Sequence, residues 1–144
     1  MKGDRKFQIL NRTHRFVLKA SRGRFGWRLL GMEVIALTTT GRKSGAERTV
    51  LLTSPIKDGD AIVVIASRGG DTKNPAWFLN LSADPNVGVS RRRRPAEPMI
   101  ARVANPEERE RLWPRITKVY KYYDGYQDRA GREIPVVLLE PAAR

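Results

Sequence analysis

The chain has 144 residues, a formal net charge of +13 and no cysteine. This length is typical of one domain that buries its own core without cross-links. The lack of cysteine excludes disulfides, thiolate metal sites and cysteine nucleophiles, and the single histidine, His14, argues against a Ser-His-Asp triad or a multi-histidine metal site. No apolar stretch reaches the ~18 residues of a membrane span. With no signal-peptide pattern either, a cytoplasmic location is expected.

The positive charge is concentrated toward the N-terminus. Residues 1–40 carry a net charge of +7, residues 41–104 carry +5 and residues 105–144 carry +1. This distribution predicts an anionic partner. Nucleic acid, an anionic membrane surface and a polyanionic cofactor all satisfy that prediction.

The first element in chain order is a basic amphipathic helix, expected over residues 5–21. Its apolar residues Phe7, Leu10 and Val17 recur at helical spacing among several arginines and lysines. We treat residues 1–30 as a basic N-terminal extension and residues 31–144 as the main domain. Two interpretations of the extension remain open: it rests on an anionic membrane surface, or it packs against the domain.

Strands are expected over residues 34–39, 49–53, 61–66, 87–89, 99–103 and 134–139, which are β-branched or continuously apolar. Asp58-Gly59 is a strong hairpin signal. The run 61–66 contains four consecutive apolar β-branched residues and is expected to be buried on both faces. Arg91 to Arg94 should form a basic turn between two strands.

Helices are expected over residues 76–81, from residue 106 onward, and over 122–129. Asn74 is expected to cap the first of them, with Pro75 at its first position. Asn105 and Glu108 form a capping-box pattern at the start of the second. Pro114 is expected to kink that helix or split it in two. Several strands follow one another without an intervening helix, which favours an α+β fold: a mostly antiparallel six-stranded sheet or small barrel with helices packed outside.

Three segments look specialised for chemistry. The turn 41–45 holds two cations and a hydroxyl between two glycines, a pattern that can bind an anion. Residues 66–80 join a hydroxyl, an arginine and two glycines to a short helix that carries a tryptophan. All four tyrosines lie within 120–126, where they could stack on a flat ligand. Each segment also has a plain interpretation, as a solvated turn, a core tryptophan and a half-buried amphipathic helix.

Taken together, these segments resemble the deazaflavin-dependent nitroreductase family, small reductases that use reduced coenzyme F420. The resemblance runs in order from about Val34 to Pro141, with matching gaps, through residues 38–45, 66–70, 74–81, 112–114, 120–127 and 132–135. It implies a split β-barrel of the flavin-reductase, FMN-binding-like type. It also accounts for the charge, because the cofactor carries a phosphodiester and a polyglutamate tail.

The resemblance also implies a set of site residues. The phosphate and tail of the cofactor would lie against Arg42, Lys43, Ser44 and Arg48. The deazaflavin would be lined by Ile65, Ala66, Ser67, Arg68, Ala76, Trp77, Phe78 and Asn80. Phe78 stands where the family often has tyrosine. Tyr120, Tyr123 and Tyr126 would bind the acceptor, and Tyr123 and Ser67 are the candidate catalytic residues.

The function expected from this resemblance is hydride transfer from reduced coenzyme F420 to a quinone, an activated alkene or a nitro compound. Either Tyr123 or solvent would supply the proton. Two alternatives remain: an FMN-binding reductase of the same fold, and a nucleic-acid-binding module that uses Arg91 to Arg94. We expect no metal site, no nucleic-acid partner, and a monomer or a homodimer.

Overall fold

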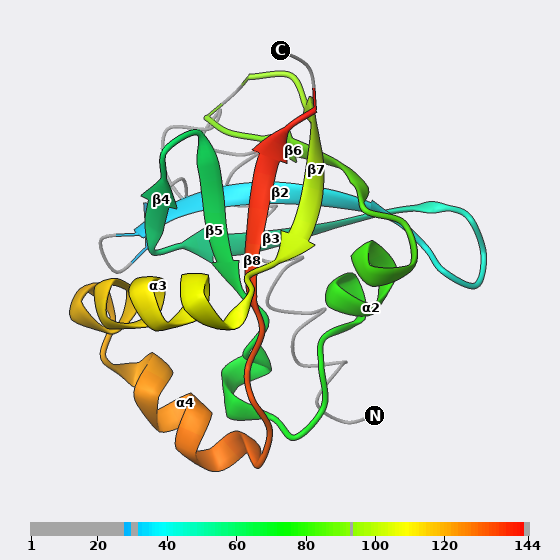
Figure 1. Ribbon diagram of the computed structural model, residues 1–144. Coiled ribbons are helices and arrows are strands. Elements are labelled where there is room, and N and C mark those ends of the chain that lie inside the picture. Colours follow the sequence, from blue (N-terminus) through cyan, green and yellow to red (C-terminus); the bar gives the residue numbers. More distant parts are fainter. Residues whose placement is uncertain (1–27, 30–31, 93, 143–144) are drawn as a thin grey trace.

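The computed structural model describes residues 28–29, 32–92 and 94–142 and shows a curled antiparallel sheet with helices outside it (Figure 1). The strands are β1 (Arg28–Leu29), β2 (Met32–Thr40), β3 (Glu47–Ser54), β4 (Ile56–Asp58), β5 (Ala61–Ile65), β6 (Asn86–Ser90), β7 (Glu97–Val103) and β8 (Val136–Pro141). The helical elements are the 3₁₀ turn η1 (Arg68–Gly70), α2 (Ala76–Ala83), α3 (Pro106–Val119) and α4 (Tyr122–Ala130). Neighbouring strands follow the order β1-β2-β6-β7-β8-β5-β4, and β3 also pairs with β2.

The α+β barrel-like fold is confirmed, but the expected number of strands is wrong. All six expected strands are present, and the described residues add β1 and β4, for eight in total. Both added strands are too short, at two and three residues, to show an alternating pattern. β4 lies between Pro55, which ends β3, and the Asp58-Gly59 turn, which folds β5 back so that it pairs with β4.

The neighbouring strands β5 and β8 are buried on both faces. Ile62 and Val64 of β5 belong to a core cluster on the inner, concave face of the sheet. Val63 and Ile65 alternate with them and belong to a second cluster on the outer face. The predicted double-sided burial of residues 61–66 is therefore confirmed.

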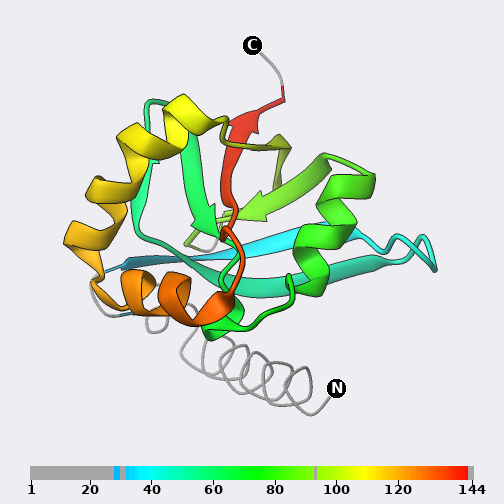
Figure 2. The same ribbon diagram turned by 60° about the horizontal axis from the view of Figure 1, so that its bottom comes forward.

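The helices divide between these two clusters. α2 adds Trp77 and Leu81 to the inner cluster. α3 adds Leu112 and Ile116 to the outer cluster, and α4 adds Tyr123. Figure 2 shows α3 and α4 together on one side of the molecule and α2 on the other. The segment between β5 and α2 therefore passes from the side of the molecule that carries α3 and α4 to the side that carries α2.

α3 begins with the expected capping box. The Asn105 side chain accepts a hydrogen bond from the Glu108 backbone N–H at 2.9 Å, and the Asn105 N–H donates to the Glu108 carboxylate at 3.1 Å. Of the two outcomes expected at Pro114, a kink or a split, the split does not occur, because one helix runs through this residue. Leu112 and Ile116 are fully buried on either side of Pro114, and their burial offsets the one backbone hydrogen bond that proline removes.

The expected cap at the start of α2 is also wrong. Pro75 occupies the N-cap position, and its side chain makes no capping hydrogen bond. The Asn74 amide oxygen instead accepts a hydrogen bond from Arg132 Nη1 at 2.6 Å. A charged donor makes a stronger hydrogen bond than a backbone N–H, which explains why Asn74 is drawn away from the helix.

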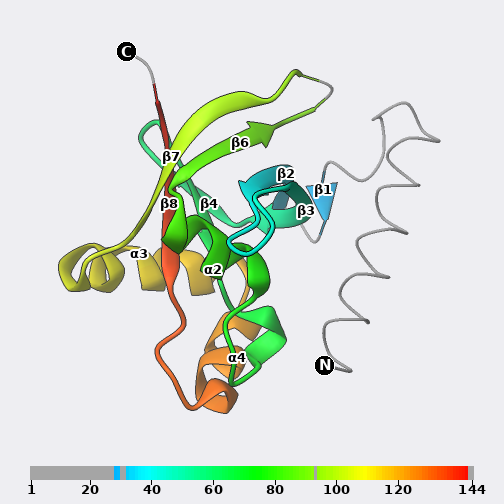
Figure 3. The same ribbon diagram turned by 90° about the vertical axis from the view of Figure 1, so that its right-hand side faces the viewer.

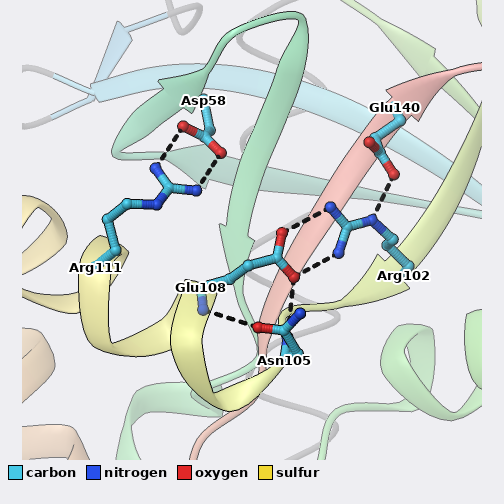
Figure 4. Close-up of polar contacts among 6 residues, drawn as sticks. All are labelled: Asp58, Arg102, Asn105, Glu108, Arg111 and Glu140. Carbon is cyan, nitrogen blue, oxygen red and sulfur yellow. Dashed lines mark hydrogen bonds and ion pairs between the residues drawn. The ribbon is translucent and has the colours of Figure 1, made fainter.

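Arginine–carboxylate pairs connect α3 to the sheet (Figure 4). Arg102 of β7 donates two hydrogen bonds to Glu108, at 2.6 and 2.7 Å, and one to Glu140 of β8, at 2.6 Å. Arg111 binds both carboxylate oxygens of Asp58, each at 2.9 Å. The hydrogen bonds from Arg102 and from the Asn105 N–H lower the pKa of Glu108 to about 2.

The basic helix expected over residues 5–21, and both interpretations of the N-terminal extension, lie outside the described residues. In the part of the chain that the structure describes, every helix is too short or too polar to cross a membrane.

The pairing of Arg102 with Glu108 predicts a pH-dependent stability. Glu108→Gln should lower the free energy of unfolding at about pH 7 by roughly 1 kcal/mol, because the amide loses the ion pair. The lowered pKa of Glu108 means that its contribution is complete above 4.5, the usual value, and is lost as pH falls toward about 2. Urea denaturation measures this effect. The difference in free energy of unfolding between Glu108→Gln and the parent should be smaller at about pH 3 than at about pH 7.

Asn105→Ala provides the matched control. It removes a neutral capping group and should lower the free energy of unfolding by roughly 1 kcal/mol at both pH values. If Glu108→Gln lowers the free energy of unfolding by the same amount at both pH values, the assignment of a pH-dependent ion pair to Glu108 and Arg102 is contradicted.

Candidate functional site

A cationic pocket lies where the β2–β3 turn, the loop 66–75 and α2 meet; Figure 3 shows this turn beside α2. Its volume is about 440 Å³, and it is lined by Arg42, Arg68, Thr72, Lys73, Asn74, Ala76 and Leu79. Three of these side chains are cationic and none is acidic. Such a set of donors suits phosphate or carboxylate groups.

The β2–β3 turn is closed by its own backbone. The Gly41 N–H donates to the Ala46 carbonyl at 2.7 Å, and the Gly45 N–H donates to the Gly41 carbonyl at 2.8 Å. Ser44 Oγ accepts a hydrogen bond from the Ala46 N–H at 3.1 Å. A Cβ at position 41 would lie 2.8 Å from Ser44 Oγ and 3.1 Å from the Ala46 carbonyl oxygen, so a larger residue there would have to displace the Ser44 side chain. This turn presents the following residue, Arg42, to α2.

Asn80 of α2 fixes the position of Arg42. The Asn80 amide oxygen accepts hydrogen bonds from the Arg42 backbone N–H at 3.2 Å and from Arg42 Nη1 at 3.0 Å. The other side of the amide, Nδ2, donates to Thr39 Oγ1 at 3.2 Å. Asn80 and Thr39 are both buried. A buried amide that makes three hydrogen bonds gives the guanidinium a defined direction toward the pocket.

The loop after β5 forms another wall of the pocket. The Ala66 N–H donates to the Pro135 carbonyl at 3.0 Å, which attaches the start of the loop to the segment before β8. Ser67 is buried, and Arg68 has a φ of 50°, unusual for a residue with a side chain. The Arg68 guanidinium lies 3.7 Å from the Asp71 carboxylate, and its side chain is only 8% exposed.

The structure brings some of the expected cofactor residues to this pocket and leaves others away from it. Arg42, Arg68 and Ala76 line it directly. The others lie around it: Lys43, Ser44 and Arg48 are exposed on the β2–β3 hairpin, Phe78 is half-buried, and Ile65, Ala66, Ser67, Trp77 and Asn80 are buried.

Sequence reasoning missed four residues of the pocket: Thr72, Lys73, Asn74 and Leu79. Lys73 is the most informative of them. It is a cation just before the Asn-Pro pair, in a loop already assigned to the site. Among the described residues, no partner is found for its ammonium group. Its position in the sequence was a usable signal for anion binding.

The three tyrosines that the resemblance assigns to the acceptor lie together. Ring centroids of Tyr120 and Tyr123 lie 5.1 Å apart, those of Tyr123 and Tyr126 5.8 Å, and those of Tyr120 and Tyr126 6.4 Å. A hydrogen bond with Tyr126, together with burial, raises the pKa of Tyr120 to about 12. Tyr120 is therefore protonated at neutral pH and can donate a hydrogen bond.

Tyr123 is the most buried member of the cluster, at 5% exposed. Its hydroxyl lies 3.5 Å from Thr53 Oγ1 and 3.9 Å from Met32 Sδ. Burial raises the pKa of Tyr123. Its ring belongs to the outer core cluster, while its edge contacts Tyr120 and Tyr126, which are only half-buried.

The pocket loop and the tyrosines are in direct contact through Gly70. A Cβ at this position would lie 3.0 Å from the Cα atom and 3.2 Å from the carbonyl oxygen of Tyr126. Gly70 also has a φ of 86°, in the left-handed region. Only glycine therefore allows the loop to lie this close to α4. The described residues contain no group of three or more histidines, cysteines or acids placed to hold a metal ion.

Comparisons with known proteins agree with this geometry. The model of the F420H(2)-dependent quinone reductase family matches residues 10–141. An F420H(2)-dependent quinone reductase from Mycobacterium tuberculosis is 38% identical over 136 residues, which cover 90% of this chain and 89% of that protein. A second one from the same organism is 37% identical over 111 residues, 74% of this chain and 88% of that protein.

Solved structures give the same result. An F420-H2 dependent reductase, FDR-A, superposes with a TM-score of 0.65 at 38% identity, covering 74% of this chain and 93% of its own. A structure described as a domain-swapped dimer has a TM-score of 0.68 at 32% identity, and the match covers 92% of this chain and 97% of that one. A pyridoxamine 5′-phosphate oxidase-like protein from Listeria innocua, at 17% identity, shares the fold with a TM-score of 0.54, covering 76% and 84%.

The family match covers most of the chain, and its description names F420H2 and not the alternative FMN. The chain therefore belongs to the F420H(2)-dependent quinone reductase family and is an oxidoreductase whose cofactor is coenzyme F420.

Proposed function

We propose that this protein reduces a flat organic acceptor, a quinone, activated alkene or nitro compound, at the junction between the cationic pocket and the tyrosine cluster. The observation that carries the proposal is the contact of Gly70 with Tyr126, which joins the two parts of the site. Reduced coenzyme F420, when bound, supplies the hydride. The names of the relatives favour a quinone as the acceptor.

The anionic arm of the cofactor would lie against the cations of the pocket. Arg42 is held by Asn80 and directed there, and Lys73 carries an ammonium with no partner among the described residues. Lys43, Ser44 and Arg48 on the adjacent hairpin would extend this surface for the tail. A pre-positioned guanidinium loses little side-chain entropy on binding an anion, which favours tight binding.

The ring end of the cofactor would lie toward η1 and the start of α2. Ser67 and Arg68 begin the loop here, and Ala76 is the first residue of the helix. Ile65, Ala66, Trp77, Phe78 and Asn80 support this region from β5 and α2. Backbone N–H groups at a helix start can bind a ring carbonyl. Ser67 is a candidate donor at the reacting end.

The acceptor would stack against the accessible tyrosines, Tyr120 and Tyr126. Their neighbour Tyr123 is protonated, because burial raises its pKa, and its hydroxyl can donate to negative charge that develops on the acceptor. The protein's part in the reaction is to orient the acceptor, to exclude water with aromatic rings and to hold a proton at the Tyr123 hydroxyl.

Arg42→Ala should weaken cofactor binding at least tenfold, because a charged hydrogen bond contributes roughly 1.5–3 kcal/mol. Titration of the purified protein with coenzyme F420, followed by fluorescence quenching, measures the Kd. Added salt should also weaken binding by the parent protein. Arg94→Ala, in the β6–β7 turn, changes the net charge equally and should leave the Kd near the parent value. Equal Kd values for Arg42→Ala and the parent would contradict this assignment.

Tyr123→Phe should reduce turnover by up to about a hundredfold, because it removes one hydrogen-bond donor and keeps the ring. Cofactor affinity should stay nearly unchanged, since Tyr123 does not line the cationic pocket. Steady-state kinetics with menadione measure the effect, and Tyr122→Phe, at the exposed end of α4, is the matched control. If Tyr123→Phe turns over like the parent, the proton comes from solvent and Tyr123 is only a wall of the site.

The N-terminal extension is proposed to bind anionic membrane surfaces, which would bring the site to lipid-soluble quinones. This rests on the +7 charge of residues 1–40 and the apolar spacing within residues 5–21. Neutralising Arg12, Arg15 and Lys19 to glutamine in the full chain should reduce co-sedimentation with phosphatidylserine vesicles. Equal sedimentation of the variant and the parent would reject the membrane role.

A homodimer is the other open assembly prediction, and the solved relative described as a domain-swapped dimer supports it. Analytical ultracentrifugation of the full chain distinguishes the dimer from the monomer.

A further inference from the structure

Arg132 lies outside the pocket but binds the loop that forms it. It follows α4, one residue after Gly131, in the segment that leads to β8. Its Nε donates to the Asp71 carbonyl at 3.1 Å, and Nη1 donates to the Asn74 amide oxygen at 2.6 Å. Its Nη2 lies within hydrogen-bond distance of the carbonyls of Ala66, Ser67 and Lys73, at 3.1, 3.4 and 3.1 Å.

The partners of Arg132 set it apart from the arginines that pair with carboxylates. Arg91, Arg102 and Arg111 are each paired with a carboxylate. The guanidinium of Arg132 instead donates to five neutral oxygens, all within residues 66–74. Burial lowers its pKa, and no ion pair is found for it in the described part of the chain. The planar guanidinium can reach all five oxygens, with one Nη2 N–H shared between two of the three carbonyls near it. An ammonium, with three donors on one atom, cannot.

The backbone of Arg132 is itself fixed by α4. Gln127 Nε2 donates to the Arg132 carbonyl at 2.6 Å, and Gln127 Oε1 accepts from the Ile134 N–H at 2.9 Å. Arg109 of α3 donates to the same Gln127 oxygen at 2.9 Å. A chain of hydrogen bonds therefore runs from α3 and α4 through Arg132 into the loop.

The loop held in this way carries the residues that face the cofactor. Ser67 and Arg68 lie near its start, and Thr72, Lys73 and Asn74 form its end. Carbonyl oxygens carry partial negative charge, so they oppose an anion when they point at it. Four of these carbonyls are occupied by one guanidinium, which fixes the loop in the shape that directs Arg68 and Lys73 into the pocket.

We propose that Arg132 is a positioning residue for cofactor binding: it sets the shape of the loop 66–74 without touching the ligand. This inference rests on the proposed function of the pocket. It separates two roles for arginine in one site, since Arg42 would bind the anion and Arg132 would shape the surface that receives it.

Arg132→Lys tests the proposal because it keeps the charge and removes the planar fork of donors. Loss of several hydrogen bonds to the loop should raise the Kd for coenzyme F420 about tenfold. The KM for menadione should stay unchanged. The slope of log Kd against log salt should equal that of the parent, because no contact with the anion is lost. Arg42→Ala, measured in parallel, should lower that slope.

Each outcome decides the matter. A parent-like Kd for Arg132→Lys overturns the positioning role, and a lowered salt slope overturns it in favour of direct contact. If Arg42→Ala weakens binding while Arg132→Lys does not, only the inference fails. If both bind like the parent, the proposed pocket fails with it.

Gln127→Met provides an independent variant if Arg132→Lys does not fold. It releases the backbone of Arg132, is similar in volume and lies outside the residues that line the pocket. A several-fold rise in the Kd is expected, and a parent-like Kd overturns the proposal.

Discussion

The rest of the structure depends on the burial of β5 and β8 on both faces. These two strands are neighbours in the sheet, and their side chains alternate between the inner cluster under α2 and the outer cluster under α3 and α4. A strand buried on both sides cannot slip in register without exposing apolar residues on one of them. The ends of β5 and β8 are thereby fixed, and the loop 66–74 and the segment 131–135 start from those ends.

The sequence predicted those parts of the fold that depend on local patterns. The apolar run 61–66 identified β5, the strand that is buried on both faces, and Asn105 with Glu108 identified the start of α3. It failed where a residue from elsewhere in the chain changes a local preference. Asn74 has the pattern of a helix cap, but its side chain instead accepts a hydrogen bond from Arg132, 58 positions further along the chain. Pro114 has the pattern of a helix breaker, but two buried side chains hold α3 together around it.

The same distinction applies to the candidate site. Glycine-rich turns and the order of the motifs were visible in the sequence and indicated where the cofactor would bind. Which side chains share a pocket depends on how the turn after β2 meets α2, and that contact is made through one buried amide, Asn80. Lys73 was overlooked because a single lysine in a polar loop has no pattern of its own. The rings of Tyr120, Tyr123 and Tyr126 lie together, as their three-residue spacing suggests. The burial of Tyr123 could not be predicted in this way, because it follows from the packing of α4 on the sheet.

Gly70 determines how the two halves of the site move relative to each other. Its missing side chain lets the loop backbone lie directly on the backbone of α4 at Tyr126, so no rotamer change can absorb a displacement between them. A displacement of the loop at Gly70 toward α4 therefore requires a displacement of the α4 backbone. If the cofactor binds at the loop and the acceptor at the tyrosines, as proposed, this contact links the position of one to the position of the other.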